Sequence, residues 1–567
     1  MKRWMPSWLR DYWRRPEYRR QNLPGDMVAG LVVTLLLVPQ GLAYAALAGL
    51  PPQLGLYASL LPLVVYPLFG SSMVMSVGPV AVASLMTTAA LASVAPTGSP
   101  EYIAAAVVLA LLSGVLLFAF GLLRLGALAR LLSQPVVSGF ISGAALLIVI
   151  GQIRPLLGIS VQGETAAELL LGIFRQLDSL NPLTTIIGLG SLLILWLARS
   201  DLAWLLQKIG ISAALAQLAA KLVPMMLVLG SAALVTLAGW QEQLAVVGDL
   251  PRGLPSLVLP EISLALVQQL WWPALVIGVI GFVESVAIAR SFAARRGQRI
   301  DADAELRGLG AANIASAFSG AFPVTGGFSR TAVNADAGAN TPLAGIISAA
   351  LIALVLLFAT GLFRSLPMTV LAATIMVAAL ALVDLKAVRD IWRYDRTEGI
   401  ALLATALGVL LAGIEMGIGI GVALSLALLV WRSSRPHMAV LGRVPDSEHF
   451  RNVQRQQVQT RDDLLLVRVD ENLFFGNAEL VEKQLQQLLA KQPSARHLVL
   501  VMSSVSHIDA TALEMLLALS ERLQQQRVQL HLAEVKGPVA DQLAQHQVAE
   551  RLSGQIFLST YCAFVSL

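Results

Sequence analysis

One arginine stands alone in a long uncharged stretch of this chain, and it is the residue best placed to do chemistry. Arg330 is the only Asp, Glu, Lys or Arg between Gly308 and Asp336. A guanidinium at membrane depth costs about 2.5–3.5 kcal/mol on insertion scales, so such residues normally face a cavity or a partner. We therefore expect Arg330 to be functional. The alternative is a side chain that snorkels to a membrane interface.

A break in the helical pattern precedes this arginine and contains Pro323, Gly326 and Gly327. It predicts that one helix ends there and that another begins at Phe328. A helix that begins inside a membrane directs unpaired N–H groups and the positive end of its dipole at whatever lies in front of it. The hydroxyl of Ser329, the arginine and the helix N-terminus together are typical of an anion site.

A second isolated charge lies upstream. Glu284 is the only ionisable side chain between Ile262 and Ala289, in the middle of an apolar segment. Burial favours the protonated form of a carboxyl group, so Glu284 is a candidate proton carrier. The alternative is a buried ion pair between Glu284 and Arg330 that orients the helices, and the two roles are compatible.

The composition is that of a polytopic membrane protein. Of 567 residues, 56% are hydrophobic and 13% charged, and no Asp, Glu, Lys or Arg occurs between Met27 and Pro100. The first apolar run is too long for a cleavable signal, and no small-residue cleavage site follows it. The single cysteine, Cys562, excludes an intrachain disulfide framework and fits a reduced C-terminal domain.

Fourteen apolar segments are expected to span the membrane. They lie near residues 26–47, 52–70, 74–93, 103–121, 135–151, 182–198, 222–240, 271–290, 308–321, 328–338, 343–363, 367–384, 398–413 and 416–431. The basic arm 1–25 precedes them and places the N-terminus in the cytoplasm by the positive-inside rule. Because this arm adjoins a span, lipid headgroups are expected beside it rather than nucleic acid.

The charges of the loops support an even number of spans. Loops predicted to be cytoplasmic contain Arg124, Arg130, Arg199, Lys208, Lys221, Arg290, Arg295, Arg296, Arg299, Arg307, Lys386, Arg389, Arg393 and Arg396. Loops predicted to be external contain only Arg154, Arg175, Arg252 and Arg364. The C-terminus is therefore expected in the cytoplasm as well.

The third and tenth segments are short, stand seven apart, and each follows a break, Val77-Gly78-Pro79 or Thr325-Gly326-Gly327. Paired interrupted segments in corresponding positions indicate an inverted-repeat transporter with a site near the middle of the membrane. The two helix N-termini should meet there, where they would repel each other unless an anion lies between them.

The composition changes after the last span, and residues 446–567 are predicted to form a small cytoplasmic α/β domain. Strands are expected at 464–469, 497–502 and 528–532, and helices at 478–491, 510–526 and 539–547. No Walker loop, zinc-ligand spacing or catalytic triad is present, so we expect neither an enzyme nor a bound cofactor or metal.

Several motifs together resemble the sulfate permease (SulP) family of anion transporters. They are Val38-Pro-Gln-Gly-Leu-Ala-Tyr-Ala45, Ser76-Val-Gly-Pro79 and Phe328-Ser-Arg-Thr-Ala-Val-Asn334, and the C-terminal part resembles a STAS domain with Ser506-His-Ile-Asp-Ala-Thr-Ala512 at its signature loop. The resemblance implies a uracil-permease-like 7+7 inverted repeat and residues 26–435 as the transport domain. It also implies a mobile core domain, a gate domain and a homodimer.

The same resemblance implies an anion site between the third and tenth helices. Its residues would be Gln40, Tyr44, Gly78, Val80, Ala81, Phe328, Ser329 and Arg330. For Gln40 the alternative is helix packing, and for Tyr44 an interfacial aromatic. Sodium-driven bicarbonate members carry a threonine four residues after the acidic residue, where this chain has Ile288. The loss of an oxygen ligand favours proton over sodium coupling.

The STAS signature departs from that of bacterial regulators of this type, which carry a phosphoacceptor directly after the aspartate. Here Ala510 follows Asp509, and Thr511 comes one residue later. The resemblance implies a regulatory role for Asp509 and Thr511, which this departure disfavours, and Asp509 is predicted to be a helix N-cap.

The sequence as a whole predicts a bacterial inner-membrane secondary transporter of a small oxyanion, sulfate first, by alternating access with H⁺ symport. Bicarbonate, chloride or a C4-dicarboxylate remain open as substrates. A different class is a membrane-anchored anion sensor whose STAS domain recruits a cytosolic protein. A channel is disfavoured because the first and third spans offer few polar side chains.

Overall fold

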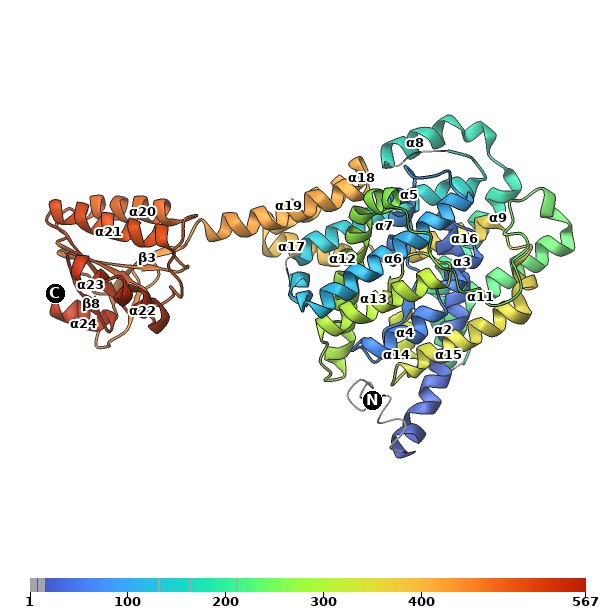
Figure 1. The fold of residues 1–567 in the computed structure, drawn as a ribbon, viewed down its shortest axis with the longest axis horizontal. Helices are drawn as coiled ribbons and strands as arrows, with labels where there is room; N and C mark the ends of the chain where they lie inside the picture. The colour runs from blue at the N-terminus through green and yellow to red at the C-terminus, as the bar shows by residue number, and fades with distance from the viewer. Residues whose placement is uncertain (1–7, 9–15, 131–132, 162, 164, 211) are drawn as a thin grey trace. The chain divides into compact units, whose positions relative to one another are not determined.

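The computed structural model describes residues 8, 16–130, 133–161, 163, 165–210 and 212–567 (Figure 1). Most of the predicted basic arm 1–25 lies outside the described residues. The chain forms two compact units, Met1–Ser425 and Leu426–Leu567. The first is helical, and the second is built on a mixed β-sheet.

Each of the fourteen predicted spans contains a described helix. The first seven correspond to α2 (Pro16–Leu47), α3 and α4 (Gln53–Tyr57 and Leu61–Phe69), α5 (Ala81–Leu91), α6 (Pro100–Leu122), α7 (Gln134–Leu157), α9 (Pro182–Ser200) and α11 (Ala213–Ala238). The others correspond to α12 (Leu264–Arg295), α13 (Ala302–Phe318), α14 (Phe328–Asp336), α15 (Leu343–Leu354), α16 (Met368–Leu380), α18 (Arg396–Ala412) and α19 (Ile414–Ser433). Among the described helices, seven are long and apolar enough to cross a membrane unaided. The short α5 and α14 are the two interrupted spans that the sequence predicts.

Short helices link these spans at their ends. They are α8 (Ala166–Arg175), α10 (Leu202–Lys208) and α17 (Leu385–Tyr394). Thr165 and Glu168 form a reciprocal capping box at the start of α8.

Glycines let α6 and α13 pack backbone against backbone (Figure 1). A Cβ on Gly114 would lie 2.6 Å from the backbone nitrogen of Ile314, and a Cβ on Gly310 would lie 2.5 Å from that of Phe118. Such contacts are typical of membrane helices, where small residues permit close approach in the absence of a hydrophobic driving force.

The second unit contains a six-stranded sheet in the order β4-β3-β5-β6-β7-β8. Its strands are β3 (Met438–Arg443), β4 (Phe450–Asn452), β5 (Leu464–Val469), β6 (His497–Val501), β7 (Gln529–Ala533) and β8 (Ile556–Phe557). From β5 to β8 neighbouring strands are parallel, whereas β3 is antiparallel to both of its neighbours. The helices are α20 (Ala478–Lys491), α21 (Ala510–Gln525), α22 (Gly537–Gln545), α23 (Val548–Arg551) and α24 (Thr560–Ser566).

The three strands and three helices predicted for this unit are confirmed, with shifts of one or two residues at their ends. The sheet also includes β3, which begins eight residues before the predicted start at 446. This strand follows closely after α19, and the polar composition that predicts the start of the domain begins only after it. Edge strands β4 and β8 are only three and two residues long, too short to give a period-two pattern.

Asp509 caps α21, as predicted. Its carboxylate accepts a hydrogen bond from the backbone N–H of Ala512 (2.8 Å) and another from that of Phe475 (2.8 Å). Both oxygens therefore have structural partners, and Thr511 is exposed on the first turn. The capping role is established, and nothing in these contacts adds to the regulatory expectation.

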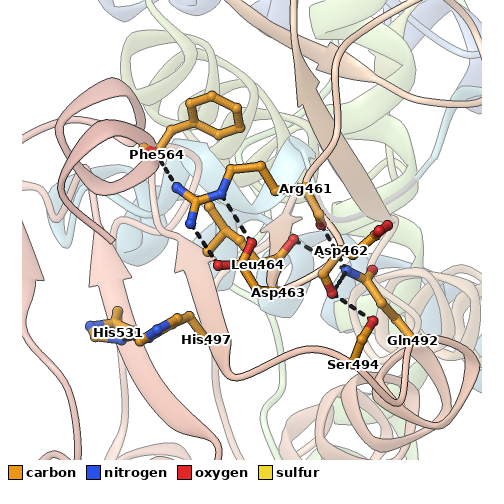
Figure 2. A network of polar contacts seen from close by, with 9 residues as sticks. All are labelled: Arg461, Asp462, Asp463, Leu464, Gln492, Ser494, His497, His531 and Phe564. Carbon is orange, nitrogen blue, oxygen red and sulfur yellow. Dashed lines mark hydrogen bonds and ion pairs between the residues drawn. The ribbon is translucent and has the colours of Figure 1, made fainter.

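Arg461 holds the C-terminal helix against the start of β5 (Figure 2). It donates to both carboxylate oxygens of Asp463 (3.0 and 2.7 Å) and to the backbone carbonyl of Phe564 (2.8 Å). The guanidinium lowers the pKa of the Asp463 carboxyl. This planar, multiply bonded arrangement is one that lysine could not reproduce.

Two histidines meet across β6 and β7, with Nδ1 of His497 and Nε2 of His531 3.2 Å apart (Figure 2). The backbone N–H of Gln555 donates to Nδ1 of His531 (2.9 Å), so the neutral ring carries its proton on Nε2. Burial and the neighbouring His497 lower the pKa of His531 to about 4. His531 is therefore neutral in the folded domain at neutral pH.

We expect the C-terminal domain to lose stability as the pH falls from 7.5 to 5. The unfolded chain binds a proton at this histidine near pH 6.5, whereas the folded chain binds one only near pH 4. The unfolded state thus carries more protons across this range, and the free energy of unfolding should decrease by about 1–2 kcal/mol. Hydrogen exchange of the β6 and β7 amides in the full-length protein measures this change.

The matched variants are His531→Gln and His546→Gln, because His546 is exposed at the end of α22. The first should flatten the pH dependence, and the second should leave it intact. An unaltered pH dependence in His531→Gln would contradict the assignment.

Candidate functional site

The two breaks in the helical pattern meet and form a short antiparallel ribbon. In β1 (Val77–Gly78) and β2 (Thr325–Gly326), Val77 pairs with Gly326 and Gly78 with Thr325. The backbone N–H of Gly327 also donates to the carbonyl of Ser76 (3.1 Å). The prediction that the two junctions lie together is confirmed.

A helix begins directly after each strand of this ribbon, α5 at Ala81 and α14 at Phe328. The residues before them, Val80 and Gly327, are extended, and neither helix has a side-chain cap. Two helix N-termini without a side-chain acceptor therefore start from one ribbon. Both direct positive dipole ends at this region, which favours negative charge there.

Hydroxyl groups fix the ribbon to α12. The hydroxyl of Thr325 donates to the carbonyl of Gly281 (2.8 Å), so the hydroxyl of Ser285 donates to Thr325 (2.8 Å). Ser285 in turn accepts from the backbone N–H of Gly326 (3.0 Å). Because Ser285 follows Glu284, the ribbon is tied to the helix that carries the isolated carboxylate.

Amides fix the two ends of the ribbon. The side chain of Asn313 in α13 accepts from the backbone N–H of Val324 (2.9 Å) and donates to its carbonyl (2.8 Å). Asn334 of α14 donates to the carbonyl of Val74 (2.8 Å), on the approach to β1. The backbone polar groups of a mid-membrane break must be satisfied within the protein, and these side chains do so.

Arg330 lies inside this assembly and is 1% exposed. Its guanidinium sits against two glycines: a Cβ on Gly78 would lie 3.0 Å from Nη1, and a Cβ on Gly327 would lie 2.8 Å from Nε and Nη2. No described residue accepts a hydrogen bond from Nη1 or Nη2. Snorkelling to an interface is thus excluded, and the two terminal nitrogens keep their capacity to donate hydrogen bonds.

Glu284 and Tyr44 lie within electrostatic range of Arg330. Glu284 is 9% exposed in the middle of α12. The direct ion pair between Glu284 and Arg330 that was considered as an alternative is absent, since both terminal nitrogens of the arginine lack partners among the described residues. Tyr44 is buried in the protein interior, so an interfacial position for it is wrong.

The other predicted site residues fall into a buried group and an exposed group. Gln40 on α2, Gly78 on β1, and Val80 and Ala81 at the start of α5 are buried. Phe328 is 50% exposed and packs against Phe292 at 6.0 Å between ring centroids, and Ser329 is also exposed. The first turn of α14 therefore presents an open face with a phenylalanine and a serine, and the arginine points inward.

Ile288 is buried one turn after Glu284 in an apolar cluster with Val74 and Phe292. The surroundings of this side chain offer carbon rather than the oxygen ligands that a hard cation requires. No group of three or more metal-ligating His, Cys, Asp or Glu side chains occurs among the described residues.

A model of the sulfate permease family matches residues 23–405, and a model of the STAS domain matches residues 455–562. The chain belongs to the sulfate permease family. Members of this family are permeases, not enzymes. The resemblance carried by the sequence motifs is confirmed.

Two relatives match this chain over most of their own length. It is 34% identical over 568 residues to "Sulfate transporter 4.1, chloroplastic" of Arabidopsis thaliana, covering 97% of this chain and 80% of that protein. It is also 34% identical over 539 residues to "Probable sulfate transporter Rv1739c" of Mycobacterium tuberculosis, covering 94% and 93%.

Solved structures share the fold. The murine Slc26a9 anion transporter in the inward-facing state has a TM-score of 0.87 at 23% identity, over 99% of this chain and 93% of that one. The transmembrane domain of the cyanobacterial bicarbonate transporter BicA has a TM-score of 0.59 at 23% identity, over 71% and 97%. The predicted architecture, a helical transporter fold followed by a STAS domain, is confirmed.

Sequence reasoning missed a buried carboxylate that fixes the approach to β1. Glu305 accepts hydrogen bonds from the hydroxyl of Tyr66 (2.7 Å), the N–H and hydroxyl of Ser71 (2.8 and 2.7 Å) and the N–H of Ser72 (3.0 Å). It lies in the first turn of α13, where an acidic residue is ordinarily explained by the helix dipole alone.

A second missed carboxylate fixes the connection after α14. Asp26, completely buried, accepts from the N–H of Asn340 (2.7 Å) and from the N–H and hydroxyl of Thr341 (2.9 and 2.6 Å). Because Asp26 lies next to the basic arm 1–25, nothing in the sequence indicates that its side chain is buried.

We expect a methyl group at Gly327 to weaken anion binding without unfolding the protein. Gly327 is extended with a negative φ, a conformation that alanine accepts, but its Cβ would displace the Arg330 guanidinium. A loss of about tenfold in sulfate affinity, equivalent to about 1.4 kcal/mol, is expected for Gly327→Ala. Titration of the purified protein measures it.

The control is Gly230→Ala in α11, where a Cβ would meet nothing within 4 Å. It should bind sulfate as the unmodified protein does. Equal affinities of the two variants would argue against a guanidinium that contacts the anion.

Proposed function

We propose that this protein is a secondary active transporter of small inorganic oxyanions, with sulfate as the first candidate, that works by alternating access and proton symport. Family membership and the names of its relatives support anion transport. The single observation that carries the proposal is the buried Arg330, whose terminal nitrogens lack acceptors beside two paired helix N-termini.

In this proposal the anion occupies the space in front of α5 and α14. Arg330 supplies charge and planar donors, and the backbone N–H groups that follow Val80 and Gly327 supply helix-end donors. Gln40 and Ser329 add an amide and a hydroxyl, and Tyr44 adds a phenolic donor. Gly78 and Ala81 leave room beside the guanidinium, and Phe328 shields the open face.

The electrostatic interaction between Glu284 and Arg330 supports the proposal of proton coupling. The positive guanidinium of Arg330 attracts the carboxylate of Glu284. An anion bound at Arg330 offsets this charge, so Glu284 in its buried surroundings then favours the protonated form. Anion and proton thus bind together, and the cycle carries less net charge than the anion alone.

The remaining expectations complete the proposal. Residues 26–435 act as the transport domain and 446–567 as the STAS domain, with both termini in the cytoplasm and the protein in a bacterial inner membrane. A homodimer is proposed by analogy with the family. The STAS domain would recruit a cytosolic protein, and no resident cofactor is proposed.

We expect Glu284→Gln to uncouple uptake from protons. A glutamine imitates the protonated carboxyl permanently, so an inward proton gradient should no longer accelerate sulfate uptake, whereas sulfate–sulfate exchange should persist. Isotope uptake into proteoliposomes at two pH values measures both. Glu261→Gln, which alters an exposed carboxylate before α12, is the matched control. Unchanged rate and pH dependence in Glu284→Gln would remove the proton-carrier role.

Competition against labelled sulfate tests the substrate class. Selenate should inhibit strongly, because it matches the tetrahedral shape and charge of sulfate, and fumarate should inhibit weakly. The reverse order would replace sulfate by a dicarboxylate, and strong inhibition by bicarbonate or chloride would favour those anions. Binding without counterflow exchange would instead favour the sensor function.

A further inference from the structure

A cavity of about 440 Å³ lies on the side of α5 that leads away from the ribbon. Leu85 and Thr88 of α5 line one wall, and Met368 and Leu371 of α16 line the facing wall. Leu85 comes one helical turn after Ala81, a rise of about 6 Å, so the floor of the cavity is close to the start of α5. The cavity therefore ends about one turn short of the proposed anion site.

Arg154 of α7 is the only charged residue among the described residues that line this cavity. A second, more open cleft of about 610 Å³ is lined by Arg154, Pro155, Ile159, Ser160, Val161 and Gln176, and Arg154 is again the only charge. Arg154 and Pro155 are common to both linings. Arg154 therefore borders both the cleft and the cavity.

Two backbone carbonyls hold this arginine in place. Nε donates to the carbonyl of Gly151 (3.1 Å), and Nη1 donates to that of Val161. No described carboxylate forms an ion pair with it. A guanidinium has five N–H donors, so donors remain after these two contacts.

We infer that Arg154 forms a capture site where a small oxyanion binds before it reaches Arg330. Apolar walls such as Leu85, Leu147 and Leu371 keep the dielectric constant low, so a single fixed charge at the mouth of the cavity attracts anions and excludes cations. The inference rests on the proposed function for the path beyond the cavity. The capture site itself requires only the cavity and its charge.

Charge-selective labelling tests the site without any transport. The only native cysteine, Cys562, is replaced by serine, and Ala89→Cys places a thiol on the α5 wall of the cavity. Membrane-impermeant anionic and cationic methanethiosulfonates are then applied from outside. Arg154→Gln should lower the ratio of anionic to cationic labelling rates about tenfold, because the attracting charge is lost.

Two variants separate charge from structure. Arg154→Lys keeps the charge but loses the fork that spans two carbonyls, and it should retain most of the labelling ratio. Arg252→Gln removes an exposed arginine that lines neither cavity, and it should change nothing. A ratio unaltered by Arg154→Gln, or a failure of Ala89→Cys to react from outside, would overturn the inference.

Uptake kinetics provide the second readout. Arg154→Gln should raise the external KM for sulfate about fivefold at low ionic strength with little change in kcat, and the difference should shrink in high salt. An unchanged KM would again overturn the capture site. If the unmodified protein transports no oxyanion, the proposed function fails, and the labelling ratio still decides whether Arg154 attracts anions.

Discussion

The pairing of β1 with β2 is the constraint on which the rest of the structure depends. Two residues on each side hold together two chain breaks that lie about 250 residues apart in sequence. The ribbon brings the N-termini of α5 and α14 and the guanidinium of Arg330 into one region. Positive charge collected in this way is costly unless an anion lies close to it, and this is the physical basis of the anion site that we propose.

Side-chain hydrogen bonds from the surrounding residues stabilise this arrangement. Ser285, Asn313 and Asn334 bind the backbone of the ribbon, and the carboxylates of Glu305 and Asp26 bind the connections that lead to and from it. All of these partners are neutral donors or acceptors or fully hydrogen-bonded carboxylates. Among the described residues, Arg330 at the start of α14 is therefore left with two terminal nitrogens that have no acceptor.

Sequence reasoning placed the elements well because their signals are local. Gly and Pro at 77–79 and 323–327 interrupt apolar runs, and the isolation of Arg330 and Glu284 is visible without any structure. In the C-terminal domain, short runs rich in apolar residues predict β5, β6 and β7. Asp509 is likewise predicted to be an N-cap from its position directly before a helical pattern.

Contacts between residues that are far apart in the chain could not be predicted from the sequence. Glu305 and Asp26 lie at helix starts or beside charged segments, where acidic residues are usually solvated, and only their distant partners reveal that they are buried. The orientation of side chains within α14 was also missed, since Phe328 and Ser329 face outward while Arg330 faces inward. Arg154 was assigned to an external loop, and only the two cavities that share it distinguish it from the other external arginines.

The central claim is that an anion binds between the two helix N-termini at Arg330, and diffraction from crystals soaked in selenate tests it most directly. Anomalous scattering at the selenium edge should give a peak in front of α5 and α14, within hydrogen-bonding distance of the Arg330 guanidinium. A selenium peak elsewhere, with Nη1 and Nη2 of Arg330 bonded to protein groups instead, would contradict the account.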